Sequence, residues 1–600
     1  MTTDTNDLIS GHLAWRQREM AYNADFDIGG DDIVAVIDGK TPELATQAAT
    51  SLAARLEAQP ALFRAVEQPD GGEFWAHNGL LYLSTADVKS NIDHLIAAQP
   101  FLGPLASDPS LRGLMGSLST ALSGVTSGQA KLADIRRPIH ALANSLDDLE
   151  QGKPAFFSWQ TTISGKPAEP RDLRHIILIK ARLDYRHLEA GREATGAIRT
   201  AAHALKLDPA HGVTVRLTGD SPLQDQEFAT LTEHIGWIAT LAVSAILLML
   251  WFAVKSARVI ACILATTLIG LVSAACLGLL VFGTFTVISV AFIPLFVGLG
   301  IDFGIQFSVR FRAEHVGERP IEEALTASGL GMGRSLTLAA TAIACGFLAF
   351  APTDYHAVSQ LGVIAGMGMF IALLLNLTVL PALLRLSRPS GRHEELGYSR
   401  LERLDSFMLR NRRLVVGAGV LAAVICAALM PLLHFDFNPI HLRSPKVESV
   451  AALLDLMKDP NTTPNSLEVL RPNLAAADRL AVQLAQLPEV HQTRTLSSFV
   501  PADQPAKLAM IDDAATLMDI SLNPFMVQPQ PSDAEVVQGL NQTAADLRSA
   551  AAGARGPDAA DALRLANDLD RLAKGPASLR EKASNMLIPG LNVVFDELRS

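Results

Sequence analysis

The sequence is poor in cysteine: its 600 residues contain four, Cys262, Cys276, Cys345 and Cys426. All four lie inside apolar segments, so they predict neither a disulfide framework nor a metal cluster, and we interpret them as small core residues. Basic residues are outnumbered, and the net charge of −11 argues against nucleic acid as a partner. Neither a nucleophile–base pair nor a phosphate-binding loop of credible spacing is present. The sequence therefore predicts no metal, no cofactor and no enzymatic activity.

Long apolar segments are what the chain does contain. The mean hydropathy is +0.25 although 18% of the residues are charged, which indicates membrane segments interleaved with soluble domains. Each of five successive segments is long enough to span a bilayer, and a sixth follows a polar connection at 389–412. The five form a predicted bundle within 231–388, at 235–253, 259–282, 286–309, 333–351 and 358–384, and the sixth occupies 413–434.

Arginine and lysine are absent from every second loop. The loops around Gly283 and around 352–356 carry none, whereas the connections after the first, third and fifth segments carry several each. Because positively charged loops stay in the cytoplasm, the connection at 389–412 is predicted to be cytoplasmic. Residues 1–230 and 435–600 then form two domains on the outer side of the membrane.

The first outer domain alternates strands and helices. Strands are predicted at Ile33–Asp38, near Leu62–Val66, at His175–Leu183 and at Val213–Gly219. The order is strand–helix–strand, a helical insertion, then strand–helix–strand, which favours an α+β sandwich of the ferredoxin-like type. The glycine-rich cluster Pro69–Gly72 is predicted to be a turn rather than a metal site.

An internal repeat relates the two halves of the chain. Asp4–Leu8 resembles Asp436–Ile440, and Pro42 and Pro472 each open a helix rich in alanine and leucine. We interpret this as two tandem halves, each a membrane helix followed by an outer domain. Since the first copy has no membrane helix before it, we expect one upstream of the first residue. We also expect a second membrane bundle downstream of the last residue, so the second half is incomplete.

Asp302 is the only ionisable residue between Thr286 and Val309. It lies eight residues before Arg310, which is about 12 Å along a helix and places it near the middle of the bilayer. Acids at this depth are costly and usually face a bundle interior or a water-filled path. Two interpretations compete: a buried acid that joins helices by hydrogen bonds, or a carboxylate that loads and releases protons.

Six further residues are predicted to surround this acid. Three glycines would let a neighbouring helix approach closely, and three polar residues could hydrogen-bond toward the carboxylate. Thr and Asn in membrane helices also join helices without any relay role, so both interpretations stay open for the polar residues. The glycines are Gly298, Gly300 and Gly304, and the polar residues are Thr337, Thr341 and Asn376.

The motifs of these helices form a recognisable set. They are Gly298–Asp302, Arg310–Glu314, Glu322–Ala324, Gly333–Ser335, the helix with Thr337, Thr341 and Gly346, and Leu217–Gly219 ahead of the first membrane segment. Together with the topology and the repeat, they resemble the resistance-nodulation-division (RND) superfamily, in its MMPL branch. Phe101–Ala106 and Asp302–Gln306 are similar, more narrowly, to hopanoid-associated RND transporters.

This resemblance implies a proton-driven exporter with two membrane bundles and periplasmic porter domains. Asp302 would occupy the proton-relay position, and its relay partner would come from the second bundle. Many MMPL members have a tyrosine after this aspartate, whereas Phe303 stands here and offers no hydroxyl group.

We therefore expect a multi-pass protein of the bacterial inner membrane that exports hydrophobic, hopanoid-like lipids in exchange for protons. Assembly as a homo-oligomer stays open. The alternative, from another class, is a sterol-sensing or scaffold protein that shares the bundle and moves no cargo. A third interpretation is an export-assisting motor for unfolded protein. Asp302 discriminates between the first two, because a sensor can dispense with an intramembrane acid.

Overall fold

The computed structural model describes residues 8–26, 32–185, 187, 189–233, 235–315, 319–389, 402–436, 438–552 and 554–599. The chain forms two compact units, each assembled from three chain segments. The first, here called the bundle unit, contains Met1–Gly30, Leu183–Ala190 and Gln224–Ser444. The second, the sheet unit, contains Asp31–Arg182, Gly191–Leu223 and Pro445–Ser600. Most of the first repeat copy, at 4–8, lies outside the described residues.

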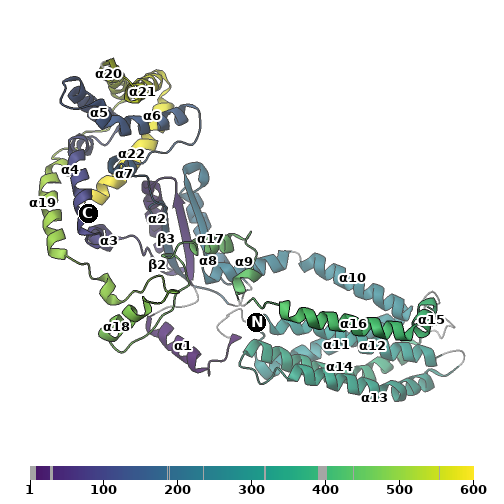
Figure 1. Ribbon diagram of the computed structural model, residues 1–600. Helices are drawn as coiled ribbons and strands as arrows, with labels where there is room; N and C mark the ends of the chain where they lie inside the picture. Colours follow the sequence, from purple (N-terminus) through teal and green to yellow (C-terminus); the bar gives the residue numbers. More distant parts are fainter. Residues whose placement is uncertain are drawn as a thin grey trace. The chain divides into compact units, whose positions relative to one another are not determined.

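All six predicted spans are helical, and each helix is long and apolar enough to cross a membrane (Figure 1). They are α10 (Ile235–Val254), α11 (Ala257–Phe282), α12 (Phe292–Glu314), α13 (Ile321–Leu348), α14 (His356–Ser387) and α16 (Arg412–Leu429).

The observed boundaries differ most from the predicted ones at the starts of α12 and α13. α12 begins after a 3-10 turn at Ser289–Ala291 rather than at 286. Thr286 and Ser289 exchange two hydrogen bonds just before α12: the Thr286 N–H donates to Ser289 Oγ at 2.9 Å, and the Ser289 N–H donates to Thr286 Oγ1 at 3.1 Å. α13 begins at Ile321, well before the predicted 333. The prediction missed its first turns because they are polar, with Glu322 and Glu323, and a search for apolar runs does not detect them.

The core of the bundle unit is built around one aromatic face of α12. Its five phenylalanines are all buried, and α12 packs against α10, α11, α13 and α14. α16 buries none of its residues. The phenylalanines are Phe292, Phe296, Phe303, Phe307 and Phe311. Their spacing near 3.6 residues puts them on one side of the helix and leaves the opposite side outside this core.

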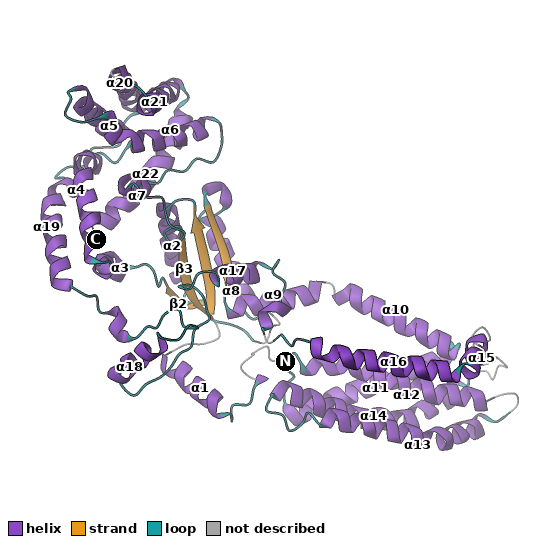
Figure 2. Ribbon diagram, viewed as in Figure 1, coloured by secondary structure: helices purple, strands orange, loops and turns teal. Residues whose placement is uncertain are grey.

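The sheet unit contains a four-stranded sheet in which every neighbouring pair is antiparallel (Figure 2). The strands are β1 (Asp32–Gly39), β2 (Phe63–Glu67), β3 (Arg174–Ala181) and β4 (Val213–Thr218), in the order β2-β3-β1-β4. This confirms the four predicted strands. Helices α2 (Pro42–Glu57) and α8 (Arg192–Ala204) follow β1 and β3, respectively. α2 begins as predicted, with the Thr41 hydroxyl accepting from the Leu44 N–H and Pro42 in the first turn.

A large helical core completes the sheet unit. Helices α4 (Thr85–Ser107), α5 (Leu111–Thr126), α6 (Arg136–Glu150) and α7 (Trp159–Ser164) come from the insertion between β2 and β3. They share one hydrophobic core with α19 (Gln504–Leu522), α20 (Asp533–Ala552), α21 (Pro557–Lys574) and α22 (Ala577–Arg599). At its centre the buried Trp159 Nε1–H donates to the Leu587 carbonyl at 2.7 Å.

This shared core differs from the sequence expectation of separate domains at 1–230 and 435–600. Parts of both pack into one unit, because the leucine and alanine faces of the insertion helices are buried against those of the carboxyl-terminal helices. α18 (Leu474–Leu484) does begin just after Pro472, as predicted, with Asn473 as its cap. The described residues 445–552 and 554–599 contain no strand, so the second copy of the repeat does not reproduce the sheet of the first within them.

Alternating charges fasten α17 (Glu448–Leu456) to the sheet. Asp455 of α17 accepts from Arg174 at 2.7 Å and from Arg216 at 2.9 Å, and both arginines also donate to Asp38 at 2.6 Å. The hydrogen bond from Arg216, followed by the charge of Arg174, lowers the pKa of Asp455 to about 2. The other end of α17 is held by Glu448, whose carboxylate accepts from the Leu217 N–H at 3.1 Å.

Candidate functional site

The carboxylate of Asp302 lies midway along α12 and is exposed on the surface of the bundle unit. The Gln306 Nε2–H donates to Asp302 Oδ2 at 2.8 Å, across one turn of the same helix. The acid therefore does not face the interior of the bundle unit, which was one of the two surroundings expected for it. The glycine and phenylalanine face of α12 occupies the interior instead, and Asp302 shares the opposite face with Pro294 and Gly298, both also exposed.

The three predicted glycines have different surroundings. A Cβ atom at Gly304 would lie 2.8 Å from Ile263 Cγ2 and 3.4 Å from Asn376 Oδ1, so this glycine permits a close approach of α11 and α14. A Cβ at Gly300 would meet Thr267 Cγ2 at an ordinary 3.6 Å, whereas one at Gly298 would have nothing within 4 Å. The close packing is therefore on the side of α12 away from the carboxylate.

The three predicted polar partners do not meet the acid in the part of the chain that the structure describes. Asn376 is 3% exposed and donates from Nδ2 to the Ala372 carbonyl at 2.8 Å, one turn earlier in α14. Thr337 is exposed and donates to the Gly333 carbonyl of its own helix at 2.7 Å. Thr341 is exposed on the same face of α13. Only Asn376 lies beside α12, at Gly304.

Hydrogen bonds of arginine side chains join the helix ends at one end of the bundle. Arg258, at the start of α11, donates to the Arg388 carbonyl at 3.1 Å, just past the end of α14. Arg385 of α14 pairs with Glu322 of α13 at 2.6 Å. Arg312 of α12 donates to the Val254 carbonyl that ends α10. The basic connections recognised in the sequence are thus collected on one side of the unit.

Gln306 is the partner of Asp302 that was not assigned from the sequence. The signal was present, because residues four apart on a helix lie next to each other and a glutamine can donate to a carboxylate at that spacing. The Asp302–Gln306 pair is polar and sits on a helix that is otherwise long and apolar. Such a pair can hold, orient or exchange a proton at the carboxylate.

Six helices able to cross a membrane, one of which carries this polar pair, define a multi-pass membrane protein. The sequence pattern of the MMPL family matches residues 173–411. The chain is also 41% identical over 602 residues to the hopanoid transporter HpnN of Rhodopseudomonas palustris (strain TIE-1), covering 100% of this chain and 69% of that protein. It is 40% identical over 605 residues to the hopanoid transporter HpnN of Burkholderia multivorans (strain ATCC 17616 / 249), covering 100% of this chain and 68% of that protein.

The chain belongs to the MMPL family of the RND superfamily. Both relatives are named as transporters, and with the family membership this makes the chain a transporter and not an enzyme.

Proposed function

We propose that this chain is a proton-driven transporter that moves hydrophobic, hopanoid-type lipids out of the bacterial inner membrane, toward the periplasm or outer membrane. The observation that carries the proposal is the identity of 41% and 40% to two hopanoid transporters along the whole chain. The acid on α12 supplies the coupling: Asp302 loads a proton on one side of the membrane and releases it on the other.

The position of Asp302 on an exposed face of α12 supports a proton relay whose second partner lies on another protein surface. A carboxylate facing lipid at the middle of a bilayer is costly, about 2.5–3.5 kcal/mol on insertion scales, so such acids face polar or protein surroundings. Its face of α12 is not covered within the bundle unit, and Gly298 beside it leaves room for close approach. We propose that a second helix bundle covers this face and brings the relay partner. Asn376 then supports α12 from behind, and Thr337 and Thr341 contribute through α13.

The energetics favour a shielded path for the cargo. Burying apolar matter is worth roughly 0.8 kcal/mol per CH₂, so exposing a lipid of about thirty carbons to water costs on the order of 20 kcal/mol. One proton crossing supplies about 2.3 kcal/mol per 100 mV and about 1.4 kcal/mol per pH unit. Protons can therefore drive a conformational cycle but cannot pull a bare lipid through water, and the protein has to cover the lipid along its route.

The orientation follows from the arginines. Because positively charged connections stay in the cytoplasm, the end of the bundle with Arg258, Arg312 and Arg385 is the cytoplasmic end. The sheet unit is then periplasmic. Its antiparallel order β2-β3-β1-β4, with a helix after β1 and after β3, supports a ferredoxin-like porter subdomain.

The test is the replacement Asp302→Asn in the protein as expressed in its host. The amide keeps the size and the hydrogen bond with Gln306 but removes the titrating proton. We expect normal expression and membrane insertion with nearly complete loss of proton-driven lipid flux in reconstituted vesicles that carry an imposed pH gradient. Asp354→Asn, the same change at an exposed acid outside the spans, is the matched control. Near-normal flux in the Asp302 variant would contradict the relay and favour the sensor or scaffold alternative.

A further inference from the structure

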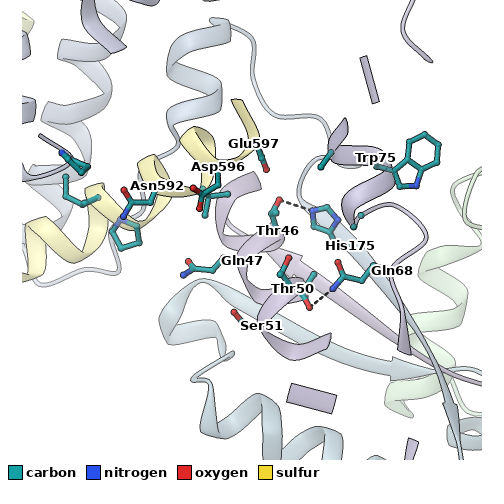
Figure 3. A pocket seen from close by; sticks show the side chains of 18 of the residues that line it. Thr46, Gln47, Thr50, Ser51, Gln68, Trp75, His175, Asn592, Asp596 and Glu597 are labelled. Carbon is teal, nitrogen blue, oxygen red and sulfur yellow. Dashed lines mark hydrogen bonds between the residues drawn. The ribbon is translucent and has the colours of Figure 1, made fainter. Parts of the chain in front are cut away.

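The sheet unit contains an open cavity of about 1040 Å³ that the sequence did not reveal. Helices α2 and α22, which also contact each other, both line it, and the rest of the lining includes the turn after β2, α3 (Glu73–Asn78) and His175 of β3 (Figure 3). Its volume is at the upper end of the range for small-molecule sites, which is roughly 300–1,000 Å³. The Pro69–Gly72 segment is a turn, as predicted, but Asp70, Gly71 and Gly72 also line this cavity.

The two helical walls each have one apolar and one polar face. α2 buries alanines and leucines, among them Ala48, Leu52 and Leu56. Its other face turns hydroxyl and amide groups to the cavity, from Thr46, Gln47, Thr50 and Ser51. α22 likewise buries an apolar face that includes Leu587, Leu591 and Phe595, and it presents Ser584, Asn585, Asn592, Asp596 and Glu597 to the cavity. The cavity is therefore lined by many hydrogen-bonding groups at fixed helical spacing.

A chain of polar contacts fixes one side of the cavity. His175 Nδ1 lies 2.9 Å from Asp70 Oδ2, and His175 Nε2 lies 3.2 Å from the Thr46 hydroxyl. The imidazole is only 20% exposed, so Asp70 and Thr46 hold its orientation (Figure 3). Trp75, at the rim, donates from its indole to the Pro69 carbonyl at 2.7 Å and keeps a ring beside these groups. A flat ring next to fixed polar groups is common where proteins bind polyhydroxylated ligands.

Carboxyl groups outnumber basic groups in the lining, where the one basic side chain is the imidazole of His175, paired with Asp70. Asp70, Asp596 and Glu597 contribute carboxyl groups, and the described residues around the cavity include no lysine or arginine. Glu597 faces the open cavity, but the surrounding protein removes enough of its hydration to raise its pKa, and Glu43 adds to that effect. An anion would meet repulsion and find no guanidinium or ammonium partner.

We propose that this cavity binds the polar end of the transported lipid and selects a head group that bears hydroxyl or amine groups, while it rejects phosphate. The inference rests on the proposed function and adds the chemistry of selection to it. Phosphate-headed lipids form the bulk of a bacterial membrane, so a transporter of a rarer lipid has to discriminate against them. Three carboxyl groups in a lining without lysine or arginine disfavour a phosphate head group, because juxtaposed like charges cost several kcal/mol.

The test measures binding without any proton gradient, so its outcome is independent of the relay. The full chain in nanodiscs is titrated with three probes that share one hexadecyl chain and carry a sorbitol ether, an aminosorbitol or a phosphate head. Photo-crosslinking followed by peptide mapping reports whether the head lies beside α2 and α22. We expect the aminosorbitol probe to bind tightest, the sorbitol probe next, and the phosphate probe at least about tenfold more weakly than the sorbitol probe.

Two variants separate the charge from the hydrogen bonds. The double variant Asp596→Asn, Glu597→Gln should bind the amine probe with less preference over the sorbitol probe. It should also reduce the difference in affinity between the sorbitol probe and the phosphate probe. Thr50→Val should weaken the sorbitol probe several-fold, because it removes one hydroxyl from the exposed face of α2 without changing its shape. Glu581→Gln, an exposed position on α22 away from the cavity, is the control.

Equal binding of all three probes, or crosslinks that map away from α2 and α22, would overturn the proposal even if the protein transports lipid. Conversely, loss of flux in Asp302→Asn with the probe order intact would support both proposals separately. Circular dichroism on each variant shows whether the helices remain folded, so that a loss of binding is not confused with unfolding.

Discussion

The ion cluster that fastens α17 predicts a measurable acid sensitivity. The pKa of Asp455 falls from 3.8 to about 2 in the folded protein, chiefly through the hydrogen bond from Arg216. A shift of this size corresponds to about 2 kcal/mol, at 1.36 kcal/mol per pKa unit. The side chain is 28% exposed, so solvent screens part of the interaction and we expect about 1–2 kcal/mol.

The sign follows from linkage. Because the folded-state pKa is lowered, the stabilisation is fully present above the unfolded pKa near 4 and is lost as the pH falls toward 2. Replacing Asp455 by Asn removes this term at neutral pH and leaves Arg174 and Arg216 with Asp38 as their remaining carboxylate in the cluster. α17 should then open more often, although Glu448 still holds its first turn against β4.

Hydrogen–deuterium exchange of the full chain in detergent measures this opening. At pH 7 we expect the amides of α17 to exchange about tenfold faster in Asp455→Asn than in the unchanged protein, since 1.4 kcal/mol is a factor of ten. At pH 2 and below, after correction for the intrinsic exchange rate, the two proteins should converge. Asp512→Asn, an exposed position on α19, is the control. Identical protection of α17 in both proteins at pH 7 would refute the stabilising role of the cluster.

Two further predictions concern packing and buried charge. Gly362→Ala would bring a Cβ to 2.5 Å from the Phe347 carbonyl oxygen, where α14 meets α13. We expect the free energy of unfolding, measured in detergent, to fall by about 1–3 kcal/mol. The control Gly346→Ala, at a position with open space around it, should leave that free energy unchanged, and equal effects of the two variants would contradict this account. Burial, followed by the charge of Asp147, raises the pKa of the fully buried Asp568 to about 7. The stability of the helical core should therefore fall as the pH rises from about 4 to 7. Asp568→Asn should raise the melting temperature more at pH 8 than at pH 5. An equal rise at the two pH values would exclude titration of Asp568 as the cause.

Local pattern was enough for the elements of this fold. Long apolar runs located the six spans, and short strand-like segments, alternating at 213–219, located the four strands, because these signals depend on residues close together in the chain. The start of α13 was missed because Glu322 and Glu323 belong to a polar helical turn that carries no apolar run. α12 likewise begins later than its apolar segment, after the 3-10 turn at Ser289–Ala291.

The site was only partly predictable for a physical reason. Helical periodicity shows that Asp302 shares a face with Gly298 and Gln306, but it does not say which face of α12 meets the other helices. The phenylalanine face decides that, through packing with α11, α13 and α14. The cavity could not be predicted at all, since Thr46, His175 and Asp596 come from distant parts of the chain and carry no common motif.

The shared core of the sheet unit also sets an order of events during synthesis. Helices α4 to α7 are made before the six spans, whereas their packing partners α19 to α22 are made after them. The leucine faces of α4 to α7 therefore lack their packing partners until the six spans have been synthesised and inserted into the membrane. Exposed apolar surface of this kind is prone to aggregation during that interval. A chaperone that holds apolar helices would act on this intermediate, and slowing translation between α7 and α19 should lower the yield of folded protein.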